Sequence, residues 1–152
     1  MADEIERRRL IVPALAPLYQ ALAPFSYAIM RFATGAILLP HGVQKLLFGS
    51  TARLAEGIAA KGLPFPLLLA YLTFIAESAA AACLAIGLLT RFAAAMIFVQ
   101  MAVIVIFFQW SGGYFWTNRG YEFPLLWAAL CLAIFFRGGG RWSVDYYLGK
   151  EI

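Results

Sequence analysis

Four long, mainly apolar segments divide this chain, and each is expected to cross the hydrocarbon layer of a membrane as a helix. Of its 152 residues, 63% are hydrophobic and 13% are charged, whereas soluble domains usually carry about 25% charged residues. A chain of this length has too little interior to bury so much apolar surface, so lipid must be part of its solvent. The sequence therefore predicts an all-α integral membrane protein with a four-transmembrane-helix bundle, the helices covering residues 25–48, 66–89, 91–110 and 123–136.

The remaining segments are interpreted as connections and tails. Residues 49–65 place charged side chains among alanines and leucines, a pattern that favours a short interfacial helix between helices one and two. The connection between helices two and three is very short, at Leu89-Thr90-Arg91, so these helices are expected to be antiparallel neighbours. Residues 1–24, which end at the helix breaker Pro24, form a predicted cytoplasmic or interfacial tail, and residues 138–152 form a predicted cytoplasmic C-terminal tail.

The positions of the basic residues predict the orientation of the chain, because Lys and Arg are concentrated in short cytoplasmic loops. More of them lie in the tails and in loop two than on the opposite side: Arg7, Arg8, Arg9, Arg91, Arg137, Arg141 and Lys150, compared with Arg53, Lys61, Arg119 and the helix-end residue Lys45. Both termini are therefore expected in the cytoplasm. These residues form no continuous stripe, so the net charge of +4 does not indicate a nucleic-acid partner, and the lipid bilayer is the expected one.

Helix one carries three ionisable side chains, Arg31, His41 and Lys45, which helical spacing gathers toward one side. Ionisable groups at membrane depth usually face the interior of the bundle, where they pair or mark a pathway. With a rise of about 1.5 Å per residue, Arg31 and Glu77 of helix two come to a similar depth. We therefore expect Arg31 and Glu77 to form a buried ion pair, which either serves a function or only fixes the register of the two helices.

A second polar cluster is expected where helix one ends and helix four begins. His41 and Lys45 lie in the last two turns of helix one, and Glu122 opens helix four from the same side. We expect a pocket for an amphipathic ring or an anion, in which His41 and Glu122 exchange protons and Lys45 holds an anionic oxygen. Two simpler interpretations stay open: Lys45 snorkels to the headgroups, and Glu122 only favours the positive end of helix four. The neighbouring binding residues are expected to be Gln109, Trp116 and Arg119.

Several other residues bear on the site and on assembly. Gln100 and Gln109 are nine residues apart and so lie on opposite faces of helix three, which prevents both from lining one cavity. The two cysteines and the single histidine form no CxxC-type pattern, so no metal site is expected. Small residues in helix two, such as Ala81 and Ala85, could support a homodimer.

From about Phe25 to Asp145, the sequence resembles the DoxX family of small bacterial membrane proteins. The resemblance rests on an ordered set of residues over the whole membrane region. The set consists of Arg31, His41-Gly42-x-x-Lys45-Leu46, Gly62-Leu63-Pro64-x-Pro66, Glu77, Gly87-Leu88-x-Thr90-Arg91, Gly120-Tyr121-Glu122 and Gly138-x-Gly140-Arg141-x-Ser143-x-Asp145.

This resemblance implies a four-helix protein of the bacterial inner membrane with a role in redox chemistry near the quinone pool. Family members look like the membrane subunit of thiosulfate:quinone oxidoreductase, so an enzymatic role would be that of such an oxidoreductase subunit. The expected ligand is a quinone, as the cofactor, or a small anionic reductant. Since the chain has no metal or flavin motif, electrons would come from a redox-enzyme partner protein or a bound cofactor. Two alternatives stay open: a non-catalytic membrane assembly factor, chaperone or scaffold, and a small transporter subunit.

Overall fold

The computed structural model describes residues 10–150, and Arg7, Arg8 and Arg9 lie outside the described residues. Within this range the chain is helical and has no strand. Its α-helices are α1 (Ala16–Ala36), α2 (Leu39–Leu47), α3 (Ser50–Ala60), α4 (Pro66–Ile75), α5 (Ala81–Ile86), α6 (Thr90–Val103), α7 (Glu122–Arg137) and α8 (Val144–Leu148). Two π-helical segments continue these helices, η3 (Ala76–Ala80) and η4 (Ile104–Gln109), and short 3-10 turns are η2 (Pro13–Leu15), η5 (Trp110–Gly112) and η6 (Trp116–Asn118).

Three helical runs in the described part of the chain are long and apolar enough to cross a membrane: Pro13–Leu47, Pro66–Ile86 and Thr90–Gly112. The predicted fourth helix is present as α7, but its 16 residues extend for only about 24 Å at the usual rise. The predicted short helix between helices one and two is present as α3.

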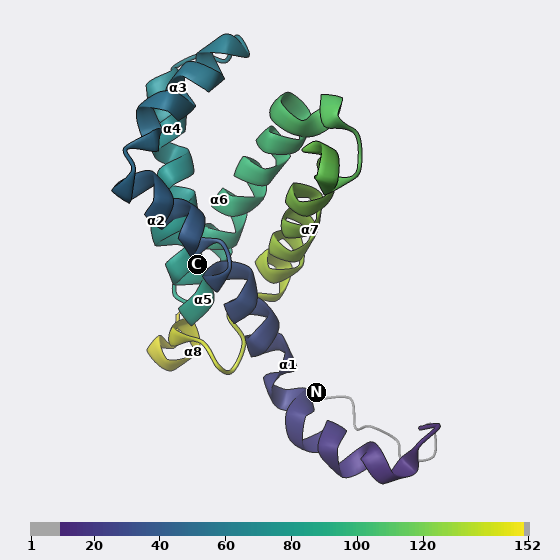
Figure 1. Cartoon of the computed structure of the whole chain (residues 1–152). Coiled ribbons are helices and arrows are strands. Elements are labelled where there is room, and N and C mark those ends of the chain that lie inside the picture. Colours follow the sequence, from purple (N-terminus) through teal and green to yellow (C-terminus); the bar gives the residue numbers. More distant parts are fainter. Residues whose placement is uncertain (1–9, 151–152) are drawn as a thin grey trace.

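The first predicted helix differs from the observed one at both its start and its middle. The observed helix α1 begins at Ala16 and continues through Pro24, because one missing backbone donor does not end a helix that is otherwise continuous. The N-terminal part of α1 extends away from the bundle in Figure 1. The α-helical pattern then stops at Ile37, and α2 begins at Leu39, directly before Pro40. A proline at this position cannot donate to a carbonyl of the preceding turn, so it favours a break there.

The helices form two diverging pairs joined near α5. Helix α3 packs along α4, and α6 packs along α7. Figure 1 shows that the two pairs separate from each other toward the ends opposite α5 and α8. The buried core lies near the junction, where Leu84, Ile97, Cys131 and Ile134 are fully buried.

Two glycines allow helix one to approach helix two closely. A Cβ at Gly35 would lie 2.5 Å from the backbone nitrogen of Ala85, and a Cβ at Gly42 would lie 2.6 Å from the carbonyl oxygen of Glu77. Ala81 and Ala85, which were expected to support a homodimer, are buried at 0% and 5% exposure. That prediction is wrong for these residues, because α1 of the same chain already covers them.

The C-terminal segment closes the narrow end of the bundle. The carboxylate of Asp145 accepts hydrogen bonds from the backbone nitrogens of Leu89 (2.8 Å) and Thr90 (2.9 Å) and from the Thr90 hydroxyl (2.6 Å). It thereby caps the N-terminus of α6, where its negative charge also interacts favourably with the positive end of the helix dipole. The two motifs Gly87-Leu88-x-Thr90-Arg91 and Gly138-x-Gly140-Arg141-x-Ser143-x-Asp145 therefore meet in the structure.

Candidate functional site

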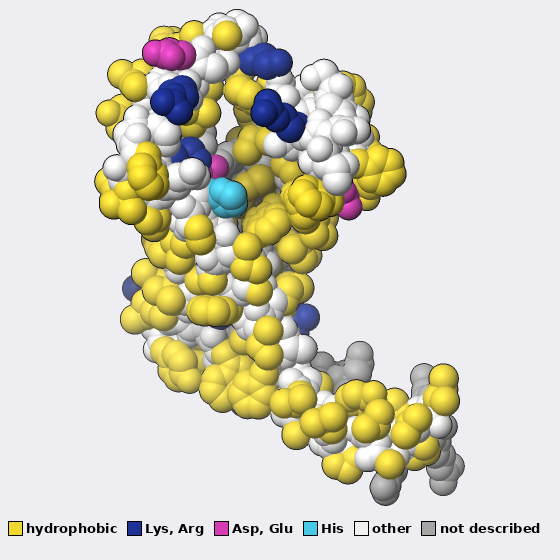
Figure 2. Space-filling view, in the orientation of Figure 1, with side chains coloured by type: hydrophobic (Ala, Val, Ile, Leu, Met, Phe, Trp, Pro, Cys, Tyr) yellow, Lys and Arg dark blue, Asp and Glu magenta, His cyan; other side chains and the backbone are white. Residues whose placement is uncertain are grey.

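A cavity of about 580 Å³ lies between the two diverging helix pairs. This volume falls within the range of about 300–1,000 Å³ that is common for small-molecule sites. Side chains from α3, α4, η3, α6, η4 and the connection between α3 and α4 form its walls, and most of them are apolar: Leu54, Ile58, Leu63, Leu69, Leu72, Ala76, Phe92, Ala95, Met96, Val99, Val103, Ile104 and Phe108. Figure 2 shows a hollow with hydrophobic walls here, with Lys and Arg side chains gathered around it.

One polar cluster interrupts these apolar walls. Lys45 of α2 forms an ion pair with Glu77 of η3, and the Gln100 side-chain nitrogen donates a 2.6 Å hydrogen bond to the other oxygen of Glu77. The side chain of Lys45 is 17% exposed and that of Glu77 is 8% exposed. Three helical segments thus place a cation, an anion and an amide together in a cavity whose other lining side chains, apart from Thr73, are apolar.

The local backbone explains how Glu77 reaches this position. It lies in η3, where one turn of π-helix widens the ladder of hydrogen bonds, and such turns are frequent at functional sites. The absence of a side chain at Gly42 lets α2 pack directly on the backbone of Glu77. Lys45 lies three residues after Gly42, on a neighbouring part of the same helix face, so it can reach the carboxylate.

Gln100 brings an unused acceptor to this cluster. Its nitrogen must face Glu77, because a carboxylate can only accept, and this fixes the orientation of the amide. The remaining Oε1 atom of Gln100 is buried and has no hydrogen-bond partner. Buried acceptors are rarely left without a donor, since the desolvation of the group costs about 1–3 kcal/mol. A ligand that carries a hydroxyl group fits this requirement.

The predicted ion pair between Arg31 and Glu77 is wrong. Arg31 instead donates to the carbonyl oxygens of Leu84 (2.8 Å), Ala85 (2.7 Å) and Trp142 (2.6 Å). Leu84 and Ala85 lie in the last turn of α5, where carbonyl oxygens lack partners within the helix and so attract a cation. The depth estimate takes the first helix to start at Phe25, whereas α1 starts at Ala16 and helix packing sets Arg31 beside the last turn of α5 rather than beside Glu77.

The predicted pocket of His41, Lys45 and Glu122 does not form. Lys45 is paired with Glu77, and a Glu122 oxygen accepts a 3.2 Å hydrogen bond from the backbone nitrogen of Trp116. His41 is exposed on α2 and does not line the cavity. Glu122 opens α7, on the opposite side of the divergence between the helix pairs, so it meets neither partner. Of the two simpler interpretations, snorkelling of Lys45 to the headgroups is not observed, because Lys45 pairs with Glu77. The interpretation that Glu122 favours the positive end of its helix agrees with its position in the first turn of α7.

The other predicted binding residues lie away from the polar cluster. Trp116 and Arg119 are exposed in the loop before α7, where η6 begins at Trp116. Gln109 is half-buried at the end of η4, and its Oε1 atom is buried without a partner. Gln100 lines the cavity and Gln109 does not, in agreement with their predicted placement on different faces.

Sequence reasoning missed Gln100 as a site residue. The available signal was an uncharged polar side chain in the middle of an apolar span, at the depth of an acid in the preceding antiparallel helix. Comparison of Gln100 with Gln109 alone does not reveal this signal, because the two side chains lie on different faces of the helix. Within residues 10–150, no three His, Cys, Asp or Glu side chains come together as metal ligands do.

Comparisons with known proteins give one result at the level of the family. Residues 26–110 match the family model described as DoxX, which covers more than half of the chain. No curated protein and no solved structure matches the chain. The matched region contains all of α2, η3 and α6, and therefore all three residues of the polar cluster.

Proposed function

Since the chain belongs to the DoxX family, we propose that it is a redox-associated membrane component that binds a quinone in the cavity between its helix pairs. The observation that carries this proposal is the polar cluster of Lys45, Glu77 and Gln100 within apolar walls. A quinone has the matching construction, with polar oxygens on a ring and an apolar tail.

Each polar residue has a distinct task in this proposal. The Lys45 ammonium donates a hydrogen bond to a carbonyl oxygen of the oxidised ring, while Glu77 keeps that ammonium in place. The Gln100 Oε1 atom accepts a hydrogen bond from a hydroxyl group of the reduced ring. The proton-exchanging role that the sequence suggested for His41 and Glu122 passes to Glu77. Electrons come from a redox partner protein, as they would for the membrane subunit of a thiosulfate:quinone oxidoreductase.

The proposal includes a topology. We place α7 across the membrane as a fourth, short span, with both termini on the cytoplasmic side of a bacterial inner membrane. Its support is the excess of Lys and Arg in the tails, at the end of α7 and in the first turn of α6. Single cysteines introduced at Lys61 and Lys150 test it, since only the former should react with an impermeant thiol reagent added outside intact cells.

The binding experiment uses purified protein in detergent micelles and decylubiquinol, with the bound fraction measured by equilibrium dialysis. Gln100→Leu removes the acceptor and should weaken binding about tenfold or more, because one buried hydrogen bond is lost. Gln109→Leu is the matched control, since it removes a second buried and unpartnered amide oxygen outside the cavity. Wild-type protein that does not bind decylubiquinol, or equal weakening in both variants, contradicts the proposal.

A cavity-filling variant tests the location independently of hydrogen bonds. Ala95→Phe places a ring inside the cavity, whereas Ala129→Phe adds the same ring to an exposed position of α7. Only Ala95→Phe should abolish decylubiquinol binding. Retained binding in Ala95→Phe would exclude this cavity as the site.

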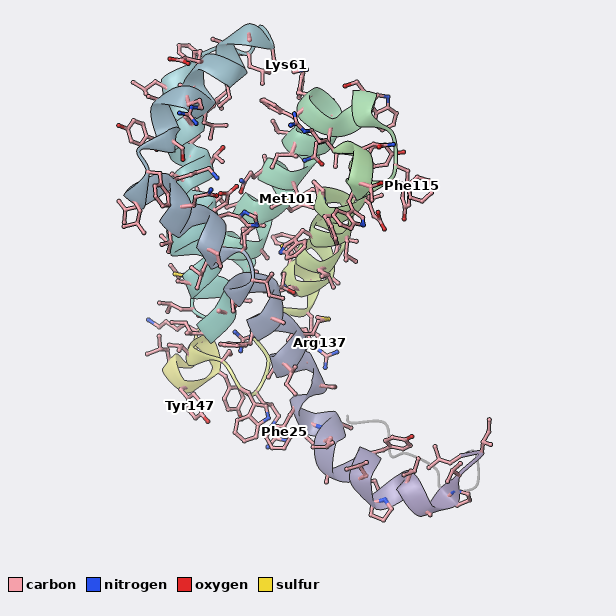
Figure 3. The ribbon with its side chains drawn as sticks, in the orientation of Figure 1. Phe25, Lys61, Met101, Phe115, Arg137 and Tyr147 are labelled. Carbon is pink, nitrogen blue, oxygen red and sulfur yellow. The ribbon has the colours of Figure 1, made fainter. Side chains whose placement is uncertain are left out.

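A scaffold function is the second candidate, and exposed aromatic side chains in the loop before α7 favour it. Phe115 is 65% exposed and Trp116 is 57% exposed, and Figure 3 shows Phe115 at the outer edge of the molecule. A partner protein that co-purifies with the wild type, is lost in Phe115→Ser/Trp116→Ser and is retained in Gln100→Leu would favour this function over quinone binding.

A further inference from the structure

A second hollow lies at the narrow end of the bundle, apart from the cavity of the polar cluster. It has a volume of about 330 Å³ and is lined by apolar side chains of α1, by the end of α5 and by Trp142, with Arg31 among them. The rings of Phe25 and Trp142 lie 4.9 Å apart and form one wall. Figure 3 shows Phe25 where α1 passes the C-terminal segment. We call this hollow the Arg31 groove.

Among the described residues that line the Arg31 groove, Arg31 alone carries a charge, and it is 2% exposed. Three carbonyl oxygens accept hydrogen bonds from its two terminal nitrogens. Its Nε–H group is buried and has no partner. A buried donor that lacks an acceptor is destabilising, and this is more so for a charged group. The Arg31 groove therefore lacks one acceptor oxygen.

The positive charge around Arg31 also favours the binding of an anion. Among the described residues, no carboxylate forms an ion pair with Arg31. The nearby Asp145 has both carboxylate oxygens engaged by the N-terminus of α6. Three further arginines lie in the segments that meet at this end of the bundle, so among residues 10–150 positive charge exceeds negative charge there: Arg91, Arg137 and Arg141.

We propose that the Arg31 groove binds an anionic phospholipid. The lipid phosphate supplies the missing acceptor to Arg31, and an acyl chain lies along the exposed apolar side chains Ile29 and Phe32 of α1. Basic pockets between transmembrane helices at the cytoplasmic surface bind anionic headgroups in this way, because the charge of the lipid meets that of the protein in a medium of low dielectric. The bound lipid joins α1 to the C-terminal segment at the closed end of the bundle.

The test compares lipids and variants in the same purified protein. Delipidated protein in micelles is mixed with equal amounts of dioleoyl phosphatidylglycerol and dioleoyl phosphatidylcholine, and bound lipid is counted by native mass spectrometry. Wild-type protein should retain at least about tenfold more phosphatidylglycerol than phosphatidylcholine. Ala28→Phe fills the Arg31 groove and should remove this preference, whereas Ala21→Phe, on the exposed part of α1, should keep it. Inorganic phosphate at millimolar concentration should not displace the lipid.

A second measurement does not depend on how the variants fold. Phosphatidylglycerol with a photoreactive group on its acyl chain should crosslink to wild-type Ile29, Phe32 or Ile86, located by peptide mass spectrometry. Equal retention of the two lipids, loss of bound lipid to inorganic phosphate, or crosslinks confined to other helices would overturn the proposal. Quinone binding by the Gln100 cluster does not depend on any of these outcomes.

Discussion

The ion pair between Lys45 and Glu77 permits a test that separates a stabilising role from a functional one. Both side chains are largely buried, at 17% and 8% exposure. Removal of one partner from a buried pair costs about 3–5 kcal/mol, because an uncompensated charge stays behind. Lys45→Met should therefore lower the free energy of unfolding by about 3 kcal/mol, and Glu77→Leu by about 2–3 kcal/mol, since the flexible lysine can turn partly toward water.

The double variant should be much less destabilised than the sum of the two single variants. Lys45→Met/Glu77→Leu leaves no charge in the cavity, and its main cost is the Gln100 hydrogen bond, about 1 kcal/mol. The sum of the single effects is about 5–6 kcal/mol, so the coupling energy between the two side chains should be about 4 kcal/mol.

Unfolding by dodecyl sulfate in mixed micelles, followed by tryptophan fluorescence, measures these free energies. Decylubiquinol binding is measured on the same samples. We expect a double variant that is nearly as stable as the wild type and no longer binds decylubiquinol. If the double variant is destabilised by the full sum, the two groups are not coupled and the reasoning is refuted. If it stays stable and still binds, the ion pair has no part in the site.

Two further predictions concern the packing that positions the site. Gly42→Ala should destabilise the protein by about 1–3 kcal/mol, since its Cβ would lie 2.6 Å from the Glu77 carbonyl oxygen. Gly57→Ala is the control and should not destabilise the protein, because its Cβ would meet no atom. Unfolding in mixed micelles measures both variants, and equal effects would contradict the close approach at Gly42. Asp145→Ala removes the three hydrogen bonds that cap α6 and should lower the free energy of unfolding by about 3 kcal/mol in the same assay. Glu122→Ala loses one exposed hydrogen bond and should lower it by only about 0.5 kcal/mol. Similar losses in the two variants would show that the C-terminal segment does not stabilise the bundle.

The site was predicted only in part from the sequence, and the reason is the register between helices. The polarity of Lys45 and Glu77 at membrane depth marked both as site residues, since such groups are costly in lipid without a partner. Which acid meets which base depends on where each helix starts and how closely it packs. Helix α1 starts at Ala16 rather than after Pro24, and Gly42 brings α2 onto η3, so Lys45 takes the carboxylate that the sequence predicts for Arg31.

The sequence by itself determined that this protein is helical and embedded in a membrane, because apolar composition and segment length depend only on local residue types. It also indicated the family, through motifs spread along the chain. Only the tertiary structure decided that Gln100 completes the polar cluster and that Asp145 caps α6 from 55 residues away. Partners so distant in sequence are chosen by helix packing, in which a shift of one residue turns a side chain by about 100° and changes what it can reach.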